Sequence, residues 1–210
     1  MGDGRAGRKD SQRLPIWKLR KTTKGNDHHS LIIESRNLYI IMTKLTKETV
    51  LKAQKIKLLL TDCDGVLTDG GVCYSANGEE MKRFSLRDGM GVERLRNLVH
   101  VETGIITGEN SDIVLRRVEK LGIREYHPGV RNKVSVLQEI LNRKKLTTEE
   151  VAYIGDDSND IEIMKHVGLS ACPADAMPFV IEIANIITDN KGGSGAFRDF
   201  AEIIINAKTK

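Results

Sequence analysis

The sequence has little of what marks a disulfide scaffold or a membrane span. Its three cysteines, Cys63, Cys73 and Cys172, are widely spaced and form no CxxC pair, so neither a disulfide framework nor a zinc knuckle is indicated. The best N-terminal apolar stretch, residues 31–42, is interrupted by charges and is shorter than the roughly 20 residues that cross a bilayer. We therefore expect a cytoplasmic protein with no membrane partner.

Aromatic residues are also scarce, at 4% of the chain, so aliphatic side chains must fill the interior. The net charge of +4 lies in the tail, because residues 1–30 hold eight basic and three acidic residues. The sequence predicts a disordered or non-native basic extension over residues 1–45 and one folded domain over 46–210. Nucleic-acid binding stays open only for that tail. The tail also holds the isolated pair His28-His29, for which metal binding is disfavoured because no further ligands lie nearby.

From residue 43 onward, apolar runs alternate with helical patterns, which indicates parallel strands joined by crossover helices. The runs expected to be strands are 56–61, 101–107, 151–155, 169–172 and 186–187, with a short strand or loop beginning at Tyr126. Helices are expected over 43–55, 91–98, 111–121, 134–146, 161–167 and 178–184, with a last helix after the glycine-rich 192–195. The predicted fold is a three-layer, doubly wound, mostly parallel α/β sheet.

A β-hairpin is predicted directly after the first strand. Residues 72–74 and 80–84 flank Asn77-Gly78, which is a strong signal for a tight hairpin turn. We expect this hairpin to project from the sheet as a flap.

Two carboxylates follow the first predicted strand. Asp62 and Asp64 stand two residues apart, and Gly65 lets the chain turn, so both carboxylates can converge on one cation. An Asx-rich turn that caps a helix explains this short motif equally well. Further strand ends are needed to decide between them.

Two further strand ends carry polar residues. Thr107-Gly108 offers a hydroxyl and open backbone amides, which suit phosphate oxygens or the start of a helix. Asp156, Asp157 and Asp160 follow the strand 151–155, and a helix cap alone does not explain three aspartates in five positions. Lys133 begins a helix, where a cation is unfavourable for the helix dipole unless it neutralises a nearby anion such as phosphate.

In this order the motifs resemble those of the haloacid dehalogenase superfamily over roughly residues 55–207. The resemblance implies Mg²⁺ held by Asp62, the backbone carbonyl of Asp64 and Asp156, with Asp62 as the nucleophile. It implies that Asp64 is the acid and base, and that Thr107, Gly108 and Lys133 hold the phosphoryl oxygens. Asp157 and Asp160 are expected to support the metal or its water ligands.

The gaps between these motifs leave no room for a cap domain. In this respect the chain resembles the capless subfamily, and the resemblance implies a homotetramer whose subunits help to close one another's sites. Within it the chain is similar to phosphatases of 2-keto-3-deoxy sugar acid phosphates. The stretches that carry this similarity are 60–71, 77–80, Phe84, 87–89, 105–109, 153–157 and 192–198. The last of these ends in Arg198, which is expected to bind a substrate carboxylate.

One position bears on the sugar acid. Glu109 follows the Thr-Gly pair, as in the phosphatases of sialic-acid-type 9-phosphates, where those of 3-deoxy-D-manno-octulosonate 8-phosphate usually have Arg. With Arg117 and Lys120 on the next helix, this favours a nine-carbon substrate, with the eight-carbon one as the alternative.

Three further functions compete with a sugar-acid phosphatase. They are a small phosphatase for nucleotides or plain sugar phosphates, an inactive regulatory domain, and a receiver-like signalling domain. The intact set of Asp62, Asp64, Lys133 and Asp156 disfavours the inactive domain. The receiver is disfavoured because its acceptor aspartate lies on the third strand, whereas Asp62 follows the first.

Overall fold

The computed structural model describes residues 45–209. The predicted basic extension and the pair His28-His29 lie outside the described residues, apart from Leu45, and stay predictions. Within 45–209 no helix has both the length and the apolar character that a bilayer span requires.

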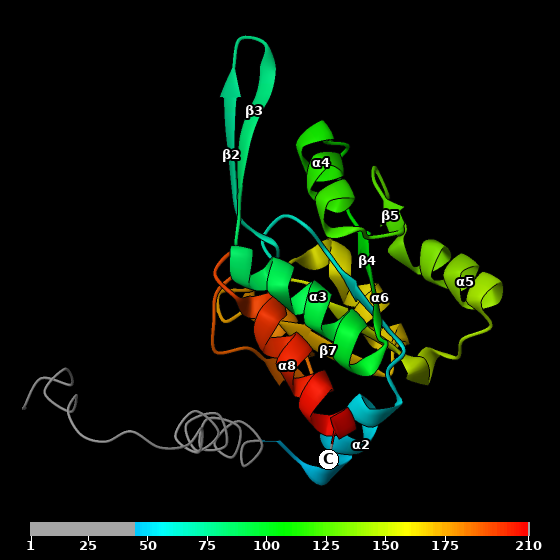
Figure 1. Cartoon of the computed structure of the whole chain (residues 1–210). Helices are drawn as coiled ribbons and strands as arrows, with labels where there is room; N and C mark the ends of the chain where they lie inside the picture. The colour runs from blue at the N-terminus through cyan, green and yellow to red at the C-terminus, as the bar shows by residue number, and fades with distance from the viewer. Residues whose placement is uncertain (1–44, 210) are drawn as a thin grey trace, which may run out of the picture. The chain divides into compact units, whose positions relative to one another are not determined.

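A six-stranded parallel sheet forms the centre of the fold (Figure 1), in the order β5-β4-β1-β6-β7-β8. Its strands are β1 Leu58–Thr61, β4 Glu102–Ile106, β5 Glu125–His127, β6 Val151–Ile154, β7 Leu169–Cys172 and β8 Ile186–Ile187. The central strand β1 pairs in parallel with β4 on one side and β6 on the other. The predicted doubly wound α/β fold is confirmed.

Helices cover both faces of the sheet. They are α2 Lys47–Lys55, α3 Leu86–Val99, α4 Asp112–Leu121, α5 Lys133–Lys144, α6 Ile161–His166, α7 Pro178–Ile181 and α8 Ala196–Thr209. Alternate side chains of β1 point to opposite faces of the sheet and so belong to two hydrophobic cores. Leu59 packs with α2, α3, α4 and α8, whereas Leu58 and Leu60 pack with α5, α6 and α7. This arrangement gives the three expected layers.

The predicted hairpin is present and longer than expected. Strands β2 Thr68–Ser75 and β3 Gly78–Phe84 pair antiparallel and form a separate two-stranded sheet. Figure 1 shows this hairpin standing away from the central sheet, next to the start of α3. Gly78 takes a φ of 112°, a backbone conformation that side chains rarely adopt, which explains the turn at Asn77-Gly78.

Helix α3 begins five residues before the predicted Gly91, which corrects the sequence-based boundary. Ser85 caps the helix by accepting a hydrogen bond from the backbone N–H of Arg87. Gly89 and Gly91, which weaken a helix in isolation, lie where other elements approach closely. A Cβ on Gly91 would lie 3.3 Å from the Cα of Arg198 on α8, so tertiary packing of α3 against α8 overrides local propensity.

Candidate active site

The site begins at the end of β1. Asp62 extends the strand by one residue, because its backbone N–H donates to the carbonyl of Ile154 at 3.0 Å. The chain then turns around the carbonyl of Cys63, which accepts hydrogen bonds from the N–H groups of Val66, Leu67 and Thr68. Asp62 is only 5% exposed, so the fold holds a carboxylate at the buried edge of the sheet.

Asp64 faces the hairpin. Its Oδ2 lies 2.6 Å from Nζ of Lys82 on β3, and its Oδ1 accepts a hydrogen bond from the Thr68 hydroxyl at 3.2 Å. The Lys82 side chain is 1% exposed and also lies 3.6 Å from Glu79, whose carboxylate accepts from the Ser111 hydroxyl at the start of α4. The hairpin therefore reaches directly to the predicted acid and base.

A buried network lies beneath Asp62. Lys133 Nζ, at the start of α5, lies 2.9 Å from Asp62 Oδ1 and donates to Asp160 Oδ1 at 2.6 Å. Asp160 also accepts hydrogen bonds from the Tyr153 hydroxyl and from the backbone N–H groups of Asp156 and Asp157. Burial alone would lower the pKa of Lys133, but the two carboxylates raise it, so the ammonium stays charged.

Asp156 and Asp62 form an arrangement that fits a divalent cation. Ligand oxygens of Asp62, Asp156 and Asp160 lie within 4.8 Å of one another. Burial and the charge of Asp160 raise the pKa of Asp62 to about 7, and burial and the charges of Asp62 and Asp160 raise the pKa of Asp156 to about 8. Asp156 Oδ1 is buried without a hydrogen-bond partner, whereas the oxygens of Asp160 already accept several hydrogen bonds. Asp156, together with Asp62 beside Lys133, thus offers the carboxylate oxygens that suit Mg²⁺.

The strand ends surround a pocket of about 290 Å³. Its lining residues are Asp62, Asp64, Thr107, Gly108, Glu109, Asp156, Asp157, Ser158 and Asn159. Thr107 is buried, and its hydroxyl accepts a hydrogen bond from the backbone N–H of Glu109. Asp157 caps the short helix after β6 by accepting from the backbone N–H of Ser158. The pocket brings the three predicted strand ends together with Glu109.

Three predicted specificity residues lie outside this pocket lining. Arg117 donates to the carbonyl of Ser85 and stacks over the Phe84 ring at 5.6 Å, so it braces the base of the hairpin. Lys120 is exposed near the end of α4. The Nε of Arg198 donates to Glu202 on the next turn of α8. Their roles in substrate recognition stay predictions.

Sequence reasoning missed two residues of the site. Lys82 reads as one more charge in a hairpin, and nothing in its local sequence marks its burial next to Asp64 and Glu79. Tyr153 lies in a continuous apolar strand, yet its buried hydroxyl donates to Asp160 and accepts from Lys133. A tyrosine in a strand buried on both faces needs a polar partner, and that requirement was the available signal.

The fold and this site together define a hydrolase that works with a metal ion at the carboxyl edge of a doubly wound sheet. Residues 118–198 match the family model described as haloacid dehalogenase-like hydrolase. Over 166 residues the chain is 39% identical to the 3-deoxy-D-manno-octulosonate 8-phosphate phosphatase KdsC of Escherichia coli. That alignment covers 79% of this chain and 88% of the relative.

Comparison with solved structures gives the same result. The phosphatase of the same name from Yersinia pestis superposes with a TM-score of 0.75 at 37% identity, over 78% of this chain and 88% of that one. The Moraxella catarrhalis phosphatase, solved with a magnesium ion, a phosphate ion and a KDO molecule, gives 0.75 at 32% identity, over 78% and 94%. The chain belongs to the haloacid dehalogenase-like hydrolase family, and it is a phosphatase, a phosphoric monoester hydrolase.

Proposed function

We propose that this chain hydrolyses the phosphate ester of a 2-keto-3-deoxy sugar acid through an aspartyl phosphate on Asp62. The observation that carries the proposal is the convergence of Asp62, Asp156 and Lys133, in which a buried carboxylate lies between an ammonium and a second carboxylate. An aspartate in a mere capping turn needs neither partner. An inactive domain is disfavoured because each of these groups is present and in place.

The substrate proposed first is 3-deoxy-D-manno-octulosonate 8-phosphate. Support comes from the curated relatives and solved structures, which carry the name of that activity at 32 to 39% identity. They give no support to the nine-carbon preference that the sequence suggested. The nine-carbon acid remains the second candidate on one observation, since Glu109 lines the pocket with Asp62 at the position where phosphatases of the eight-carbon substrate usually have Arg.

In the first half of the reaction, an oxygen of Asp62 attacks phosphorus and the bond from phosphorus to the sugar oxygen breaks. The departing oxygen takes a proton from the Asp64 carboxyl group. In the second half, a water attacks the aspartyl phosphate, Asp64 accepts the proton of that water, and the phosphate leaves Asp62. Lys133, the Thr107 hydroxyl and the Gly108 amide hold the phosphoryl oxygens, whose negative charge is the main obstacle to the attack.

Mg²⁺ is the proposed cofactor, held by Asp62, Asp156 and the backbone carbonyl of Asp64. When bound, it neutralises phosphate charge and aligns the phosphoryl group with the nucleophile. Asp160 and Asp157 support this ligand set without belonging to it. Asp160 instead positions Lys133 and the backbone of Asp156, while Asp157 caps the following helix.

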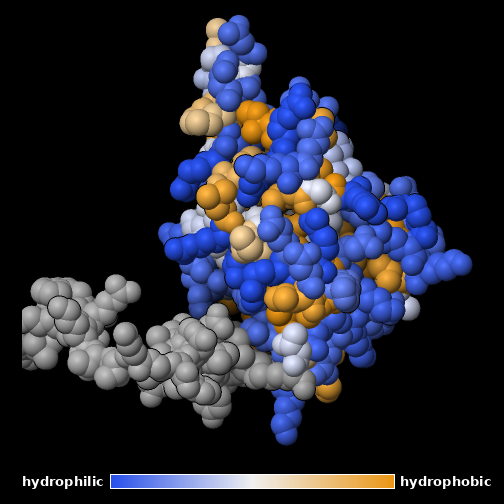
Figure 2. All heavy atoms as spheres, viewed as in Figure 1, coloured by the Kyte–Doolittle hydropathy of each residue, from blue (hydrophilic) through white to orange (hydrophobic). Residues whose placement is uncertain are grey.

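The proposed assembly is a homotetramer. Large apolar side chains are exposed on the hairpin, where Tyr74 is 69% and Met81 58% exposed, and along α3, where Leu86 is 79% and Met90 47% exposed. Figure 2 shows hydrophobic atoms among hydrophilic ones over α3 and at the hairpin. Such side chains are typical of a surface that another subunit covers. Sedimentation velocity tests the assembly, and a monomer at micromolar concentration would contradict it.

Steady-state kinetics test the proposed reaction. Phosphate release is measured with Mg²⁺ on the 8-phosphate and the 9-phosphate acid, with a plain hexose phosphate as the third substrate. We expect the highest kcat/KM on the 8-phosphate, and Asp62→Asn abolishes release of phosphate from all three. Fastest turnover of the hexose phosphate would exclude the sugar-acid assignment, and absence of Mg²⁺-dependent release would favour an inactive domain.

A further inference from the structure

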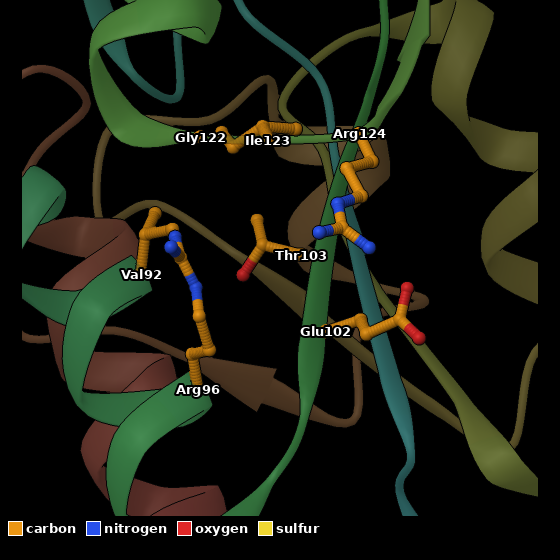
Figure 3. Close-up of a pocket in the computed structure, with 7 residues that line it drawn as sticks. All are labelled: Val92, Arg96, Glu102, Thr103, Gly122, Ile123 and Arg124. Atoms are coloured by element: carbon orange, nitrogen blue, oxygen red, sulfur yellow. The ribbon is translucent and has the colours of Figure 1, made fainter.

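A second pocket lies at the opposite end of β4 from Thr107. It has a volume of about 270 Å³ and is lined by Val92, Arg96, Glu102, Thr103, Gly122, Ile123 and Arg124 (Figure 3). Thr103 and Thr107 are four residues apart on an extended strand, which separates them by about 13 Å. The pocket is therefore distinct from the phosphatase site.

Two guanidinium groups flank this pocket. Figure 3 shows Arg96 of α3 on one side of Thr103 and Arg124, which precedes β5, on the other. Arg96 is held in place because its Nη2 donates to the carbonyl of Leu121 at 2.5 Å, which leaves its remaining N–H groups open. Within residues 45–209, Arg124 makes no hydrogen bond or ion pair, so its whole guanidinium is available.

The one acidic residue of the lining is already neutralised. The Glu102 carboxylate accepts a hydrogen bond from Lys144 Nζ at 2.7 Å. In Figure 3 this carboxylate points away from Arg96. The two arginines therefore give the pocket a net positive charge.

Thr103 supplies an independent observation. Thr103 is 9% exposed, and its hydroxyl is buried without a hydrogen-bond partner in the described part of the chain. An unsatisfied buried hydroxyl costs about 1 to 3 kcal/mol, and a ligand oxygen would recover this. The hydroxyl lies between the two arginines, so an oxyanion that both arginines bind would lie next to it.

We infer that this pocket binds a phosphate group, free or esterified, between Arg96 and Arg124. Arginine matches the tetrahedral oxyanion because its planar group donates two parallel hydrogen bonds. Val92 and Ile123 add apolar walls, so the pocket has room for an organic group attached to the phosphate. The inference is independent of the proposed reaction, since none of these residues takes part in it.

Methyl NMR of the full chain with Mg²⁺ tests the site, with inorganic phosphate as the probe. The methyl signals of Val92 and Ile123 are expected to shift saturably, and Arg124→Gln weakens this response by roughly tenfold or more. Arg116→Gln is the matched control because that arginine is exposed on α4 and, among residues 45–209, pairs only with Glu119. It leaves the response unchanged. Thr103→Val, which keeps the shape of the side chain, also weakens it.

The probe is then changed to glycerol 3-phosphate with the Asp62→Asn variant, which prevents turnover. Tighter binding of the ester identifies an esterified ligand, and equal binding identifies the free ion. The inference is overturned if Val92 and Ile123 do not respond, if sodium chloride at equal ionic strength produces the same shifts, or if Arg124→Gln and Arg116→Gln behave alike.

Discussion

Lys82 Nζ lies 2.6 Å from Asp64 Oδ2, although 18 positions separate the two residues in the chain. The ammonium is 1% exposed and comes from the hairpin, whereas the carboxylate follows β1. Through this contact the hairpin reaches the proposed acid and base of the site. Because Asp64 is the proposed acid and base, we expect the residue that orients its carboxylate to affect turnover.

Replacing Lys82 with methionine is expected to lower kcat by roughly tenfold to a hundredfold, because acid and base catalysis by Asp64 depends on its position. Arg83→Met is the matched control on the same strand, since Arg83 pairs with Asp69 at the surface. It retains the wild-type kcat. Equal kcat values for Lys82→Met and Arg83→Met would show that the ion pair has no part in turnover.

Gly65→Ala tests the metal site. Gly65 has a φ of 90°, and a Cβ there would overlap the carboxylate of Asp156. We expect a loss of Mg²⁺ affinity of roughly tenfold to a hundredfold, measured by calorimetry. Gly129→Ala is the control for backbone strain alone. Gly129 has a φ of 68°, but a Cβ there would have no atom within 4 Å. The idea fails if both variants bind Mg²⁺ equally.

Asp160→Asn is expected to destabilise the fold by about 3 kcal/mol, because it removes one charge of a buried ion pair. Tyr153→Phe removes the hydrogen bond to the same carboxylate and the one accepted from Lys133, and costs about 2 kcal/mol. Urea unfolding at pH 7 measures both. A cost of Asp160→Asn no larger than that of Tyr153→Phe would argue against the network as described.

Asp88 on α3 makes stability depend on pH. Burial raises its pKa from 3.8 to about 6, although the carboxylate accepts from the backbone N–H of Arg198. The folded chain therefore binds more protons than the unfolded one between these values, so stability falls as pH rises from about 4 to 6, by about 3 kcal/mol.

Asp88→Asn keeps an oxygen for the Arg198 N–H and removes the titration. Unfolding free energies between pH 4 and 7 are expected to show a flatter slope for this variant than for the wild type. The exposed Asp112→Asn serves as the control and keeps the wild-type slope. An unchanged slope in Asp88→Asn would mean that Asp88 does not titrate in this window.

The strands and the strand-end residues could be predicted because their signals are local. Leu58, Leu59 and Leu60 form a continuous apolar run, and Asp62, Thr107 and Asp156 each follow such a run. In a parallel sheet these ends meet at one edge, so sequence order alone brings them together. The start of α3 was wrong by five residues because Gly89 weakens the local helix signal, and the close approach of Arg117 and Leu121 of α4 at this glycine cannot be seen in the sequence.

Contacts between residues far apart in the sequence could not be predicted from the sequence. The partner of Lys82 depends on how the hairpin leaves the sheet, and nothing in the local pattern fixes that direction. The bonds of the Arg198 backbone N–H to Asp88 and of Arg117 to the hairpin base likewise depend on tertiary packing. Substrate-recognition residues are the hardest to predict from the sequence, because they come from several elements.

The central claim is that Asp62 carries the phosphoryl group, and trapping that intermediate tests it most directly. The enzyme is mixed with Mg²⁺ and the 8-phosphate acid, quenched within one turnover and reduced with borohydride, which converts an acyl phosphate to an alcohol. Peptide mass spectrometry is expected to find the reduced residue at position 62, and none in Asp62→Asn. A modified residue elsewhere, or normal turnover by Asp62→Asn, would contradict the account.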